Sequence, residues 1–250
     1  MPSSPVNPGG LSSGSVATGG IAGPASQRPV QVLDDALDRD LHRLRESVLR
    51  LAGLVESQID DALAALRTFD RQGADRVRMN DPVLNELFRE IREQVVSVVA
   101  TRRPEARALR SLMAMEYVAI ELERMGDYLV HIARQTSTLA GLQQGPLRPE
   151  FGLMGELASQ QVRDILDALI EEDAARAREV AARDDEIDRL HRRVFDALVA
   201  ELAGTGDPEG ALRAVTLIDV AHDLERLGDR VVNVAEDILF LDSGQVVELG

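Results

Sequence analysis

The chain is 250 residues long, enough for one large or two small domains, and it carries a formal net charge of −15. This charge argues against a protein that binds the phosphate backbone of nucleic acids, and it fits one that binds cations or a basic partner surface. The absence of cysteine excludes disulfides, thiolate zinc sites and cysteine nucleophiles, while abundant aliphatic and few aromatic side chains favour packed helices.

The first 29 residues are rich in glycine, proline and serine, and Arg28 is their one charged residue. Such a segment buries too little apolar surface to offset the entropy lost on ordering, so residues 1–29 are predicted to form a disordered tail. The N-terminus lacks the basic start and apolar core of a signal peptide, and no apolar run approaches the ~20 residues that span a membrane. We therefore expect a cytoplasmic protein without membrane insertion.

Apolar residues recur at spacings of three and four over three segments of the first half, and each segment predicts a helix. These helices are expected over residues 32–69, 74–100 and 104–138. Pro82 is awkward inside the second segment and indicates a kink or the true helix start, while Pro104 suits a first helical position. Residues 30–140 are predicted to form one three-helix repeat.

The second half repeats this plan after a Gly/Pro-rich linker at residues 141–152. Helices are expected over residues 154–172, 174–203 and 208–241, with Asp207 as the N-cap of the last one. A shift of about 103 residues aligns the first predicted helix with the fourth, and a shift of about 102 aligns the third with the sixth, which indicates an internal repeat. We therefore predict an all-α fold of two tandem, pseudo-symmetric three-helix bundles, with residues 153–241 as the second repeat and residues 242–250 as a C-terminal tail.

One sequence motif occurs in both repeats. The string Leu-Glu-Arg-Met-Gly-Asp at residues 122–127 returns as Leu-Glu-Arg-Leu-Gly-Asp at residues 224–229. Each copy places a Glu and an Asp four residues apart, so the two carboxylates lie on one helix face. Each copy also has a glycine in mid-helix, where glycine costs about 1 kcal/mol relative to alanine. That shared glycine indicates close approach of a neighbouring helix or a bound group.

A second pair of polar residues, also four apart, is expected to approach each motif from the preceding helix. In the second repeat the pair is Asp184 and Asp188, whereas the matching pair in the first repeat is Asp81 and Asn85. Several ionised carboxylates share a site only when a cation compensates them, and such sites select hard or borderline cations. The predicted metal ligands are therefore Asp81, Glu123 and Asp127 in one site and Asp184, Asp188, Glu225 and Asp229 in the other. We expect the second site to bind metal better.

Other interpretations of these residues remain open. Acids four apart are common on solvated helices, and Arg124 and Arg226 are placed to pair with the Asp three residues later. His131 and His222 are weaker candidate ligands, while His191 stands among arginines and indicates no role. The sequence contains no Gly-rich phosphate loop, no Ser/His/Asp signal and no HExxH string.

The paired Glu-Arg-x-Gly-Asp strings, the duplicated six-helix plan and the acidic charge together resemble the PhoU family of phosphate-transport accessory and regulatory proteins. The resemblance covers about residues 32–241. It implies that Glu/Asp-xxx-Asp motifs hold metal ions at the surface: Glu123 with Asp127, and Glu225 with Asp229. The Asp184-xxx-Asp188 string matches a further such motif. The Asp81-xxx-Asn85 string departs from it, so the first site is expected to hold fewer or different metals.

The resemblance also implies a function. From it we expect a cytoplasmic homodimer that binds divalent or multinuclear metal ions (Mg, Mn, Fe or Zn) and is not an enzyme. Such a protein works between the ATP-binding subunit of a phosphate ABC transporter and a phosphate-sensing histidine kinase, as a negative regulator of the phosphate-starvation response.

Two alternatives belong to other functional classes. A carboxylate-bridged metalloenzyme needs histidine ligands at Glu-x-x-His spacing, and no Glu in this chain has a His three residues later. A purely structural helical adaptor with solvated acids predicts no change in thermal stability when Mn²⁺ or Mg²⁺ is added.

Overall fold

A computed structural model describes residues 28–142, 145–204 and 206–249, with side chains from residue 35 onward. Its helices are α1 (Arg28–Thr68), α2 (Arg71–Arg102), α3 (Ala106–Leu139), α4 (Pro149–Glu171), α5 (Ala174–Ala181), α6 (Asp184–Gly204) and α7 (Pro208–Ser243). The predicted disordered tail lies outside the described residues, except for Arg28 and Pro29, which begin α1. The described part of the predicted C-terminal tail contains the last two residues of α7.

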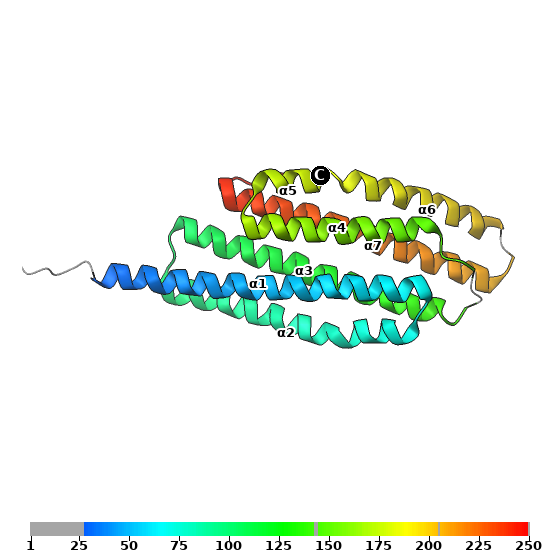
Figure 1. Ribbon diagram of the computed structural model, residues 1–250, viewed down its shortest axis with the longest axis horizontal. Helices are drawn as coiled ribbons and strands as arrows, with labels where there is room; N and C mark the ends of the chain where they lie inside the picture. Colours follow the sequence, from blue (N-terminus) through cyan, green and yellow to red (C-terminus); the bar gives the residue numbers. More distant parts are fainter. Residues whose placement is uncertain (1–27, 143–144, 205, 250) are drawn as a thin grey trace, which may run out of the picture.

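The described residues form two helical bundles and contain no strand. Figure 1 shows α1, α2 and α3 side by side in one bundle and α4 to α7 in the other, with the long helices running along the long axis of the molecule. The bundles join mainly where α3 packs along α7, and α1 also contacts α4. The all-α fold of two tandem bundles is therefore confirmed. Within the described ranges, no helix combines the length and the apolar character that crossing a membrane requires.

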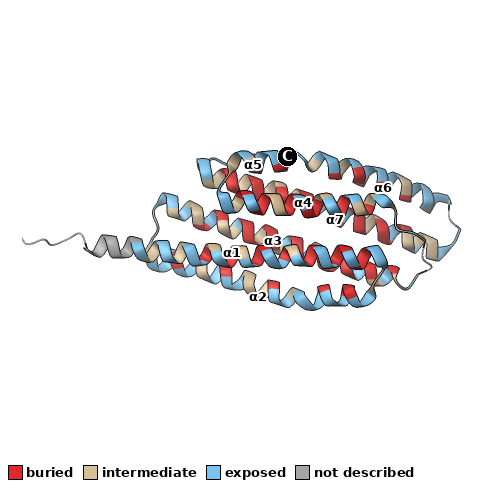
Figure 2. Cartoon of the chain, viewed as in Figure 1, coloured by how far each residue is buried: buried red, intermediate tan, exposed pale blue. Residues whose placement is uncertain are grey.

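The predicted apolar stripes form the core of the molecule. Buried residues concentrate on the helix sides that face other helices, shown in red in Figure 2. On α7 an apolar stripe with spacings of three and four is buried: Leu217, Val220, Leu224, Leu227, Val231 and Val234. Burial of such aliphatic side chains stabilises the fold by about 1.5–3 kcal/mol each, so periodic apolar spacing determines which face of each helix turns inward.

Matching turns show the internal duplication at atomic detail. Phe69 and Glu172 end the first helix of each bundle with positive φ angles of 51° and 53°. The following residues, Asp70 and Asp173, then cap the next helix by accepting hydrogen bonds from backbone N–H groups two or three residues ahead. Asp207 caps α7 in the same way, as predicted. Each cap satisfies N–H groups that the first helical turn leaves without partners.

Three predicted boundaries differ from the structure. Pro104 is not the first residue of α3, because Glu105 keeps an extended backbone with ψ of 170° and the helix begins at Ala106. The linker predicted over residues 141–152 is shorter, because α4 begins at Pro149. Proline is favoured in the first helical turn, and Phe151 anchors that turn in the core. Pro82 lies inside α2 and does not start it.

The predicted fifth helix is divided into α5 and α6, so the described residues contain seven helices where six were expected. The break falls at residues 182–183, and α6 then begins with Asp184, Asp185 and Glu186. Three acidic residues in a first turn interact favourably with the positive end of the helix dipole, which favours a new helix start at this point. The break also sets the position of Asp184, one of the predicted metal ligands.

Polar pairs cross the interface between α3 and α7 at related positions. Glu121 on α3 is buried and accepts hydrogen bonds from Arg230 Nη1 and Asn233 Nδ2 of α7, both at 3.0 Å. Its counterpart 102 residues later, Asp223, is also buried and contacts His131 Nδ1 of α3. Buried carboxylates are stable only with such partners, so these pairs fix how the two bundles sit together.

Candidate metal centres

The first acidic cluster lies between α2 and α3. Asp81 comes from α2, and Glu123 and Asp127 come from α3, so the fold brings together the three residues predicted for this site. Partial burial and then the charge of Asp127 raise the pKa of Asp81, and the same two causes in the same order raise the pKa of Glu123. Asn85 Nδ2 donates a hydrogen bond to Asp81 Oδ2 at 2.9 Å, which moderates the repulsion at this cluster.

The second cluster occupies the matching place between α6 and α7 and gathers four carboxylates. Asp184 and Asp188 come from α6, and Glu225 and Asp229 come from α7. Burial, followed by the charges of the other three carboxylates, raises the pKa of Asp184 to about 6. Burial and like charges also raise the pKa values of Glu225 and Asp229. A cluster in which three carboxyl groups have raised pKa values is an environment that a cation would stabilise.

The mid-helix glycines of the motifs allow the helices to approach at these clusters. A Cβ added to Gly126 would lie 2.8 Å from Leu84 Cδ1 of α2. A Cβ added to Gly228 would collide with Asp184 Oδ1 and lie 3.3 Å from Ile187 Cδ1 of α6. The close approach predicted from the glycines is therefore present in both bundles, and in the second bundle it seats a predicted ligand.

Three carboxylate oxygens at the two clusters are buried without a hydrogen-bond partner: Asp81 Oδ1, Asp184 Oδ1 and Glu225 Oε2. Leaving a buried acceptor unsatisfied costs about 1–3 kcal/mol, and more for a charged group. These orphaned oxygens and the all-oxygen donor set of the carboxylates match what a hard cation binds. The donor atoms present are therefore of the chemical kind that a metal ion binds.

The carboxylates are nevertheless not arranged as a ready-made coordination sphere. Within the described ranges, no three His, Asp or Glu side chains form a group that could hold a metal ion as they stand. An ion binding at either cluster would therefore require these side chains to change conformation. The assignment of these seven residues as metal ligands stays a prediction.

The arginines of the motif are engaged elsewhere and do not form the surface pairs considered above. Arg124 Nη1 donates to Glu121 Oε1 at 2.9 Å. Arg226 lies over the Tyr128 ring, 4.6 Å from its centroid, across the interface between α7 and α3. Arg226 thus packs between the bundles, whereas Arg124 pairs with a neighbour on its own helix. Asp229 Oδ2 instead lies 3.8 Å from Nη2 of the adjacent Arg230.

Two histidines that the sequence did not single out as a pair lie beside the second cluster. The rings of His191 on α6 and His222 on α7 have centroids 5.9 Å apart. His222 Nδ1 also lies 3.4 Å from Glu225 Oε2. Burial and then the charge of His222 lower the pKa of His191. The only sequence signal for this pair is its spacing from the acids: His191 follows Asp188 by three residues, and His222 precedes Glu225 by three.

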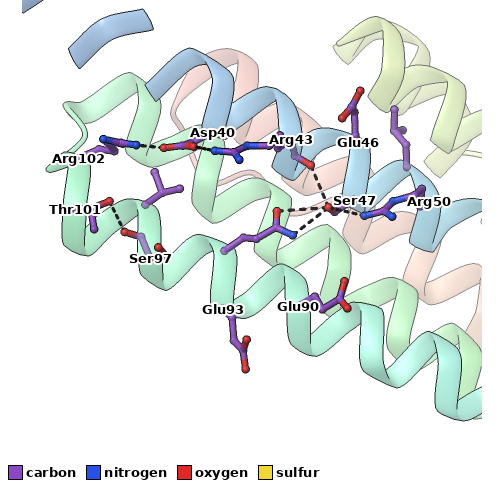
Figure 3. Close-up of a pocket in the computed structure, with 13 residues that line it drawn as sticks. Asp40, Arg43, Glu46, Ser47, Arg50, Glu90, Glu93, Ser97, Thr101 and Arg102 are labelled. Atoms are coloured by element: carbon purple, nitrogen blue, oxygen red, sulfur yellow. Dashed lines mark hydrogen bonds and ion pairs between the residues drawn. The ribbon is translucent and has the colours of Figure 1, made fainter. Parts of the chain in front are cut away.

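A groove of about 1230 Å³ between α1 and α2 lies apart from both clusters, and none of the predicted ligands lines it. Figure 3 shows Arg43 and Arg102 on either side of Asp40, and Arg102 Nε donates to Asp40 Oδ2 at 2.8 Å. The hydrogen bond from Arg102 contributes most to lowering the pKa of Asp40. Because Glu46, Glu90 and Glu93 also line it, the groove is not a basic pocket for an anion.

The fold and the clusters define a class: all-helical, internally duplicated proteins with one acidic cluster per bundle. The family model for the PhoU domain matches the chain twice, over residues 48–136 and 151–238, once in each bundle. The chain belongs to the PhoU family.

Named relatives and solved structures resemble the chain over most of its length. A phosphate-specific transport system accessory protein PhoU homolog from Clostridium acetobutylicum is 31% identical and aligns over 85% of this chain and 96% of its own. A homolog with the same description from Pseudomonas putida is 33% identical and aligns over 85% of this chain and 82% of its own. The crystal structure of PhoU from Pseudomonas aeruginosa superposes with a TM-score of 0.79 at 32% identity, and it covers 83% of this chain and 99% of its own. The crystal structure of the phosphate transport system regulatory protein PhoU from Streptococcus pneumoniae also superposes with a TM-score of 0.79, at 26% identity, and covers 85% of this chain and 100% of its own.

Proposed function

We propose that this protein is a non-enzymatic accessory and regulatory protein of phosphate transport that binds metal cations at its two acidic clusters. Family membership and the printed descriptions of its relatives support the first part. The second part is supported above all by the second cluster, where four carboxylates from two helices lie together and two of them have buried oxygens without a hydrogen-bond partner.

At the proposed sites, Glu123 and Asp127 with Asp81, and Glu225 and Asp229 with Asp184 and Asp188, would hold the ions. A bound cation supplies positive charge that offsets the mutual repulsion of these carboxylates. The chain's own contribution is to position them: the glycines bring the helix pairs close, and the apolar stripe behind each motif holds the helix in register. Because the clusters lie at the bundle surface, a bound ion is accessible to a partner or to phosphate.

We also propose the partners and setting that the family resemblance implies. The protein acts in the cytoplasm, as a homodimer, between the ATP-binding subunit of a phosphate ABC transporter and a phosphate-sensing histidine kinase, and it restrains the phosphate-starvation response. The net charge of −15 supports a partner with a basic docking surface. Deletion of the gene is expected to raise expression of phosphate-starvation genes in phosphate-rich medium, and unchanged expression would contradict this role.

The metal proposal is tested by metal analysis of protein purified without chelator. Wild-type protein is compared with a variant carrying Glu123→Ala, Asp127→Ala, Glu225→Ala and Asp229→Ala. We expect bound metal in the wild type and a clear loss in the variant, with circular dichroism confirming that both are helical. Equal metal content in the two proteins would rule out the site assignment. Repeating the measurement with added phosphate shows whether the bound ions recruit it.

A further inference from the structure

The helix that faces the motif is broken in the second bundle and continuous in the first (Figure 1). α6 follows α5 after two turn residues, Ala182 and Arg183, whereas α2 runs unbroken through the matching residues 79 and 80. Across the break, Arg183 N donates to Val180 O and Glu186 N donates to Arg183 O, each at 3.1 Å. These hydrogen bonds span three residues, as in a 3₁₀-helix, and such a stretch between α-helical segments often marks a hinge.

A buried glutamine of the second bundle lacks the hydrogen bond that its counterpart makes. In the first bundle, Gln58 Nε2 donates to Val77 O of the continuous α2 at 3.2 Å. The matching residue of α4, Gln161, is 2% exposed, and neither of its amide atoms has a hydrogen-bond partner among the described residues. The carbonyl that corresponds to Val77 O is Val180 O, which accepts from Arg183 N at the break. Because an unsatisfied buried polar group is destabilising, the broken conformation carries a penalty that a continuous helix can relieve.

An ion pair with α4 stabilises the break. Arg183 Nη2 donates to Asp164 Oδ2 at 2.6 Å, and the Asp164 side chain is only 20% exposed. Arg176 of α5 also lies near this carboxylate, with Nη2 3.6 Å from Asp164 Oδ1. The first bundle cannot form the pair, because Asn80 stands at the position that matches Arg183. The two bundles therefore differ both in the contact that favours a break and in the hydrogen bond that a break removes.

The break also determines where Asp184, the first residue of α6, is placed. Its Oδ1 occupies the space over Gly228, where an added Cβ would collide with it. In the first bundle the matching space over Gly126 is occupied by Leu84 and by Gln58 Oε1. One residue turns the chain by about 120° in a 3₁₀-helix and by about 100° in an α-helix. Conversion of three residues at the break to α-helix therefore changes the direction of the Asp184 side chain relative to α5 by about 60°.

We propose that the break between α5 and α6 is a two-state hinge, and that its conversion to a continuous helix turns Asp184 away from Gly228 and so changes the carboxylates that the second acidic cluster presents. The ion pair of Arg183 with Asp164 favours the broken state, and the unpartnered amide of Gln161 favours the continuous state. The hinge itself requires no bound ion, whereas its effect on cation binding rests on the proposed function. The first bundle, with its continuous α2, has no such hinge.

Spin labels on the two sides of the break measure its state. The chain has no cysteine, so Glu179→Cys on α5 and Asp196→Cys on α6, both at exposed positions, carry the only labels. Arg76→Cys with Glu93→Cys labels the matching positions of unbroken α2 and gives the distance expected for a continuous helix, about 26 Å between Cα atoms. Double electron–electron resonance is measured on the full-length protein in chelator. We expect the wild type to show a main distance set by the break and a minor population at the α2 reference.

Two variants shift the hinge in opposite directions. Arg183→Asn introduces the residue that α2 has at this position, and it should enlarge the population at the reference distance at least about threefold. Gln161→Leu removes the unpartnered amide and should abolish that population. Asp167→Asn removes a different ion pair between α4 and α5, with Arg176 at 2.8 Å, and should leave the distances unchanged.

Amide hydrogen exchange of residues 182–186 gives a second readout on protein without labels. Arg183→Asn should slow this exchange, because a continuous helix protects these amides, whereas a static break that loses its ion pair would exchange faster. Distances that are the same in the wild type, Arg183→Asn and Gln161→Leu, or faster exchange in Arg183→Asn, would overturn the hinge. Thermal melting verifies that each variant is folded. Because both measurements are made in chelator, failure of the metal sites leaves the hinge standing, and failure of the hinge leaves the metal sites standing.

Discussion

The two acidic clusters carry the same motif in different surroundings. The motif helices α3 and α7 both present a Glu and an Asp four residues apart, with a glycine between them. The helices that face them have diverged: α2 contributes Asp81 and Asn85, whereas α6 contributes Asp184 and Asp188. In the first cluster an amide hydrogen bond offsets the repulsion at Asp81, whereas the matching acid of the second cluster, Asp184, has no such bond and its pKa is raised to about 6. The comparison shows that duplication preserved the helix that carries the motif, while the facing helix determines how much negative charge each cluster holds.

The largest expected effect comes from removing the charge that distinguishes the second cluster. Asp184→Asn with Asp188→Asn is expected to weaken Mn²⁺ binding at that cluster roughly 100-fold, about 2.7 kcal/mol. The metal-free variant should melt at a higher temperature than wild type at pH 7. Burial and neighbouring acids raise the pKa of Asp184 to about 6, so its ionised form destabilises the metal-free fold. Calorimetric titration and thermal melting in chelator measure the two effects. Asp81→Asn is the matched control in the first cluster. It should change both the Mn²⁺ affinity and the melting temperature of the metal-free protein less than the double variant does.

A second difference between the repeats lies at the interface and predicts a pH dependence. Gln135 on α3 donates to Asp219 Oδ2 at 3.3 Å, whereas its counterpart 102 residues later is Asp237 on α7. Burial, followed by the charges of Glu121 and Glu236, raises the pKa of Asp237 to about 8. The folded protein thus holds this proton more tightly than the unfolded chain. The resulting stability is fully present below pH ~4 and is lost as the pH rises towards ~8.

Asp237→Asn should therefore stabilise the protein at pH 9 by about 2 kcal/mol, after allowance for partial exposure of the carboxyl. It should leave stability at pH 4 nearly unchanged. Urea unfolding at both pH values measures this difference, and exposed Asp196→Asn is the control. A gain of the same size at both pH values would show that the effect does not arise from ionisation of Asp237.

The sequence predicts those features of the fold and clusters that depend on one helix at a time. Apolar spacing of three and four identifies the buried faces, and the repeated motif indicates where Gly126 and Gly228 allow a close neighbour. The facing pair Asp184 and Asp188 is also found from the sequence, because the two acids lie four residues apart beside an apolar line, and the offset of the repeat then points to Asp81 and Asn85. For features that lie on a single helix, the spacing of residues along the sequence is therefore enough to predict which face is buried and which residues share it.

Features that depend on contacts between helices are missed. His191 and His222 are 31 residues apart, and only the crossing of α6 and α7 places their rings together. Arg226 could be assigned to Asp229 by helical spacing, yet it lies over Tyr128 of the other bundle. The break before Asp184 is missed because the apolar pattern continues through it while the acidic first turn of α6 starts a new helix. Linear spacing does not encode which helices meet.

The two motif glycines should respond differently to the same substitution. In Gly126→Ala the new Cβ meets buried Leu84 of the core, and overpacking by about 1–3 kcal/mol exceeds the gain of about 1 kcal/mol in helix propensity. We expect a net loss of stability of about 1 kcal/mol. In Gly228→Ala the new Cβ meets the carboxylate end of Asp184, which can rotate away. That variant should keep its stability and lose Mn²⁺ affinity at the second cluster. Chemical unfolding and calorimetric titration of both variants test this contrast, and equal stability changes would contradict it.

The smallest expected effect, less than about 1 kcal/mol, comes from giving the first cluster the charge of the second. Asn85→Asp creates the Asp-xxx-Asp pair that α6 already has, and it replaces the amide that donates to Asp81 Oδ2 with a like charge. In chelator the variant should therefore be slightly less stable than wild type, since a hydrogen bond is lost and repulsion is added. With Mn²⁺ present the order of stability should reverse, because the added carboxylate then binds the ion as an additional ligand. Melting temperatures measured with and without Mn²⁺ test the reversal. A variant that stays less stable at saturating Mn²⁺ would show that the first cluster is limited by its geometry, and not by its missing carboxylate.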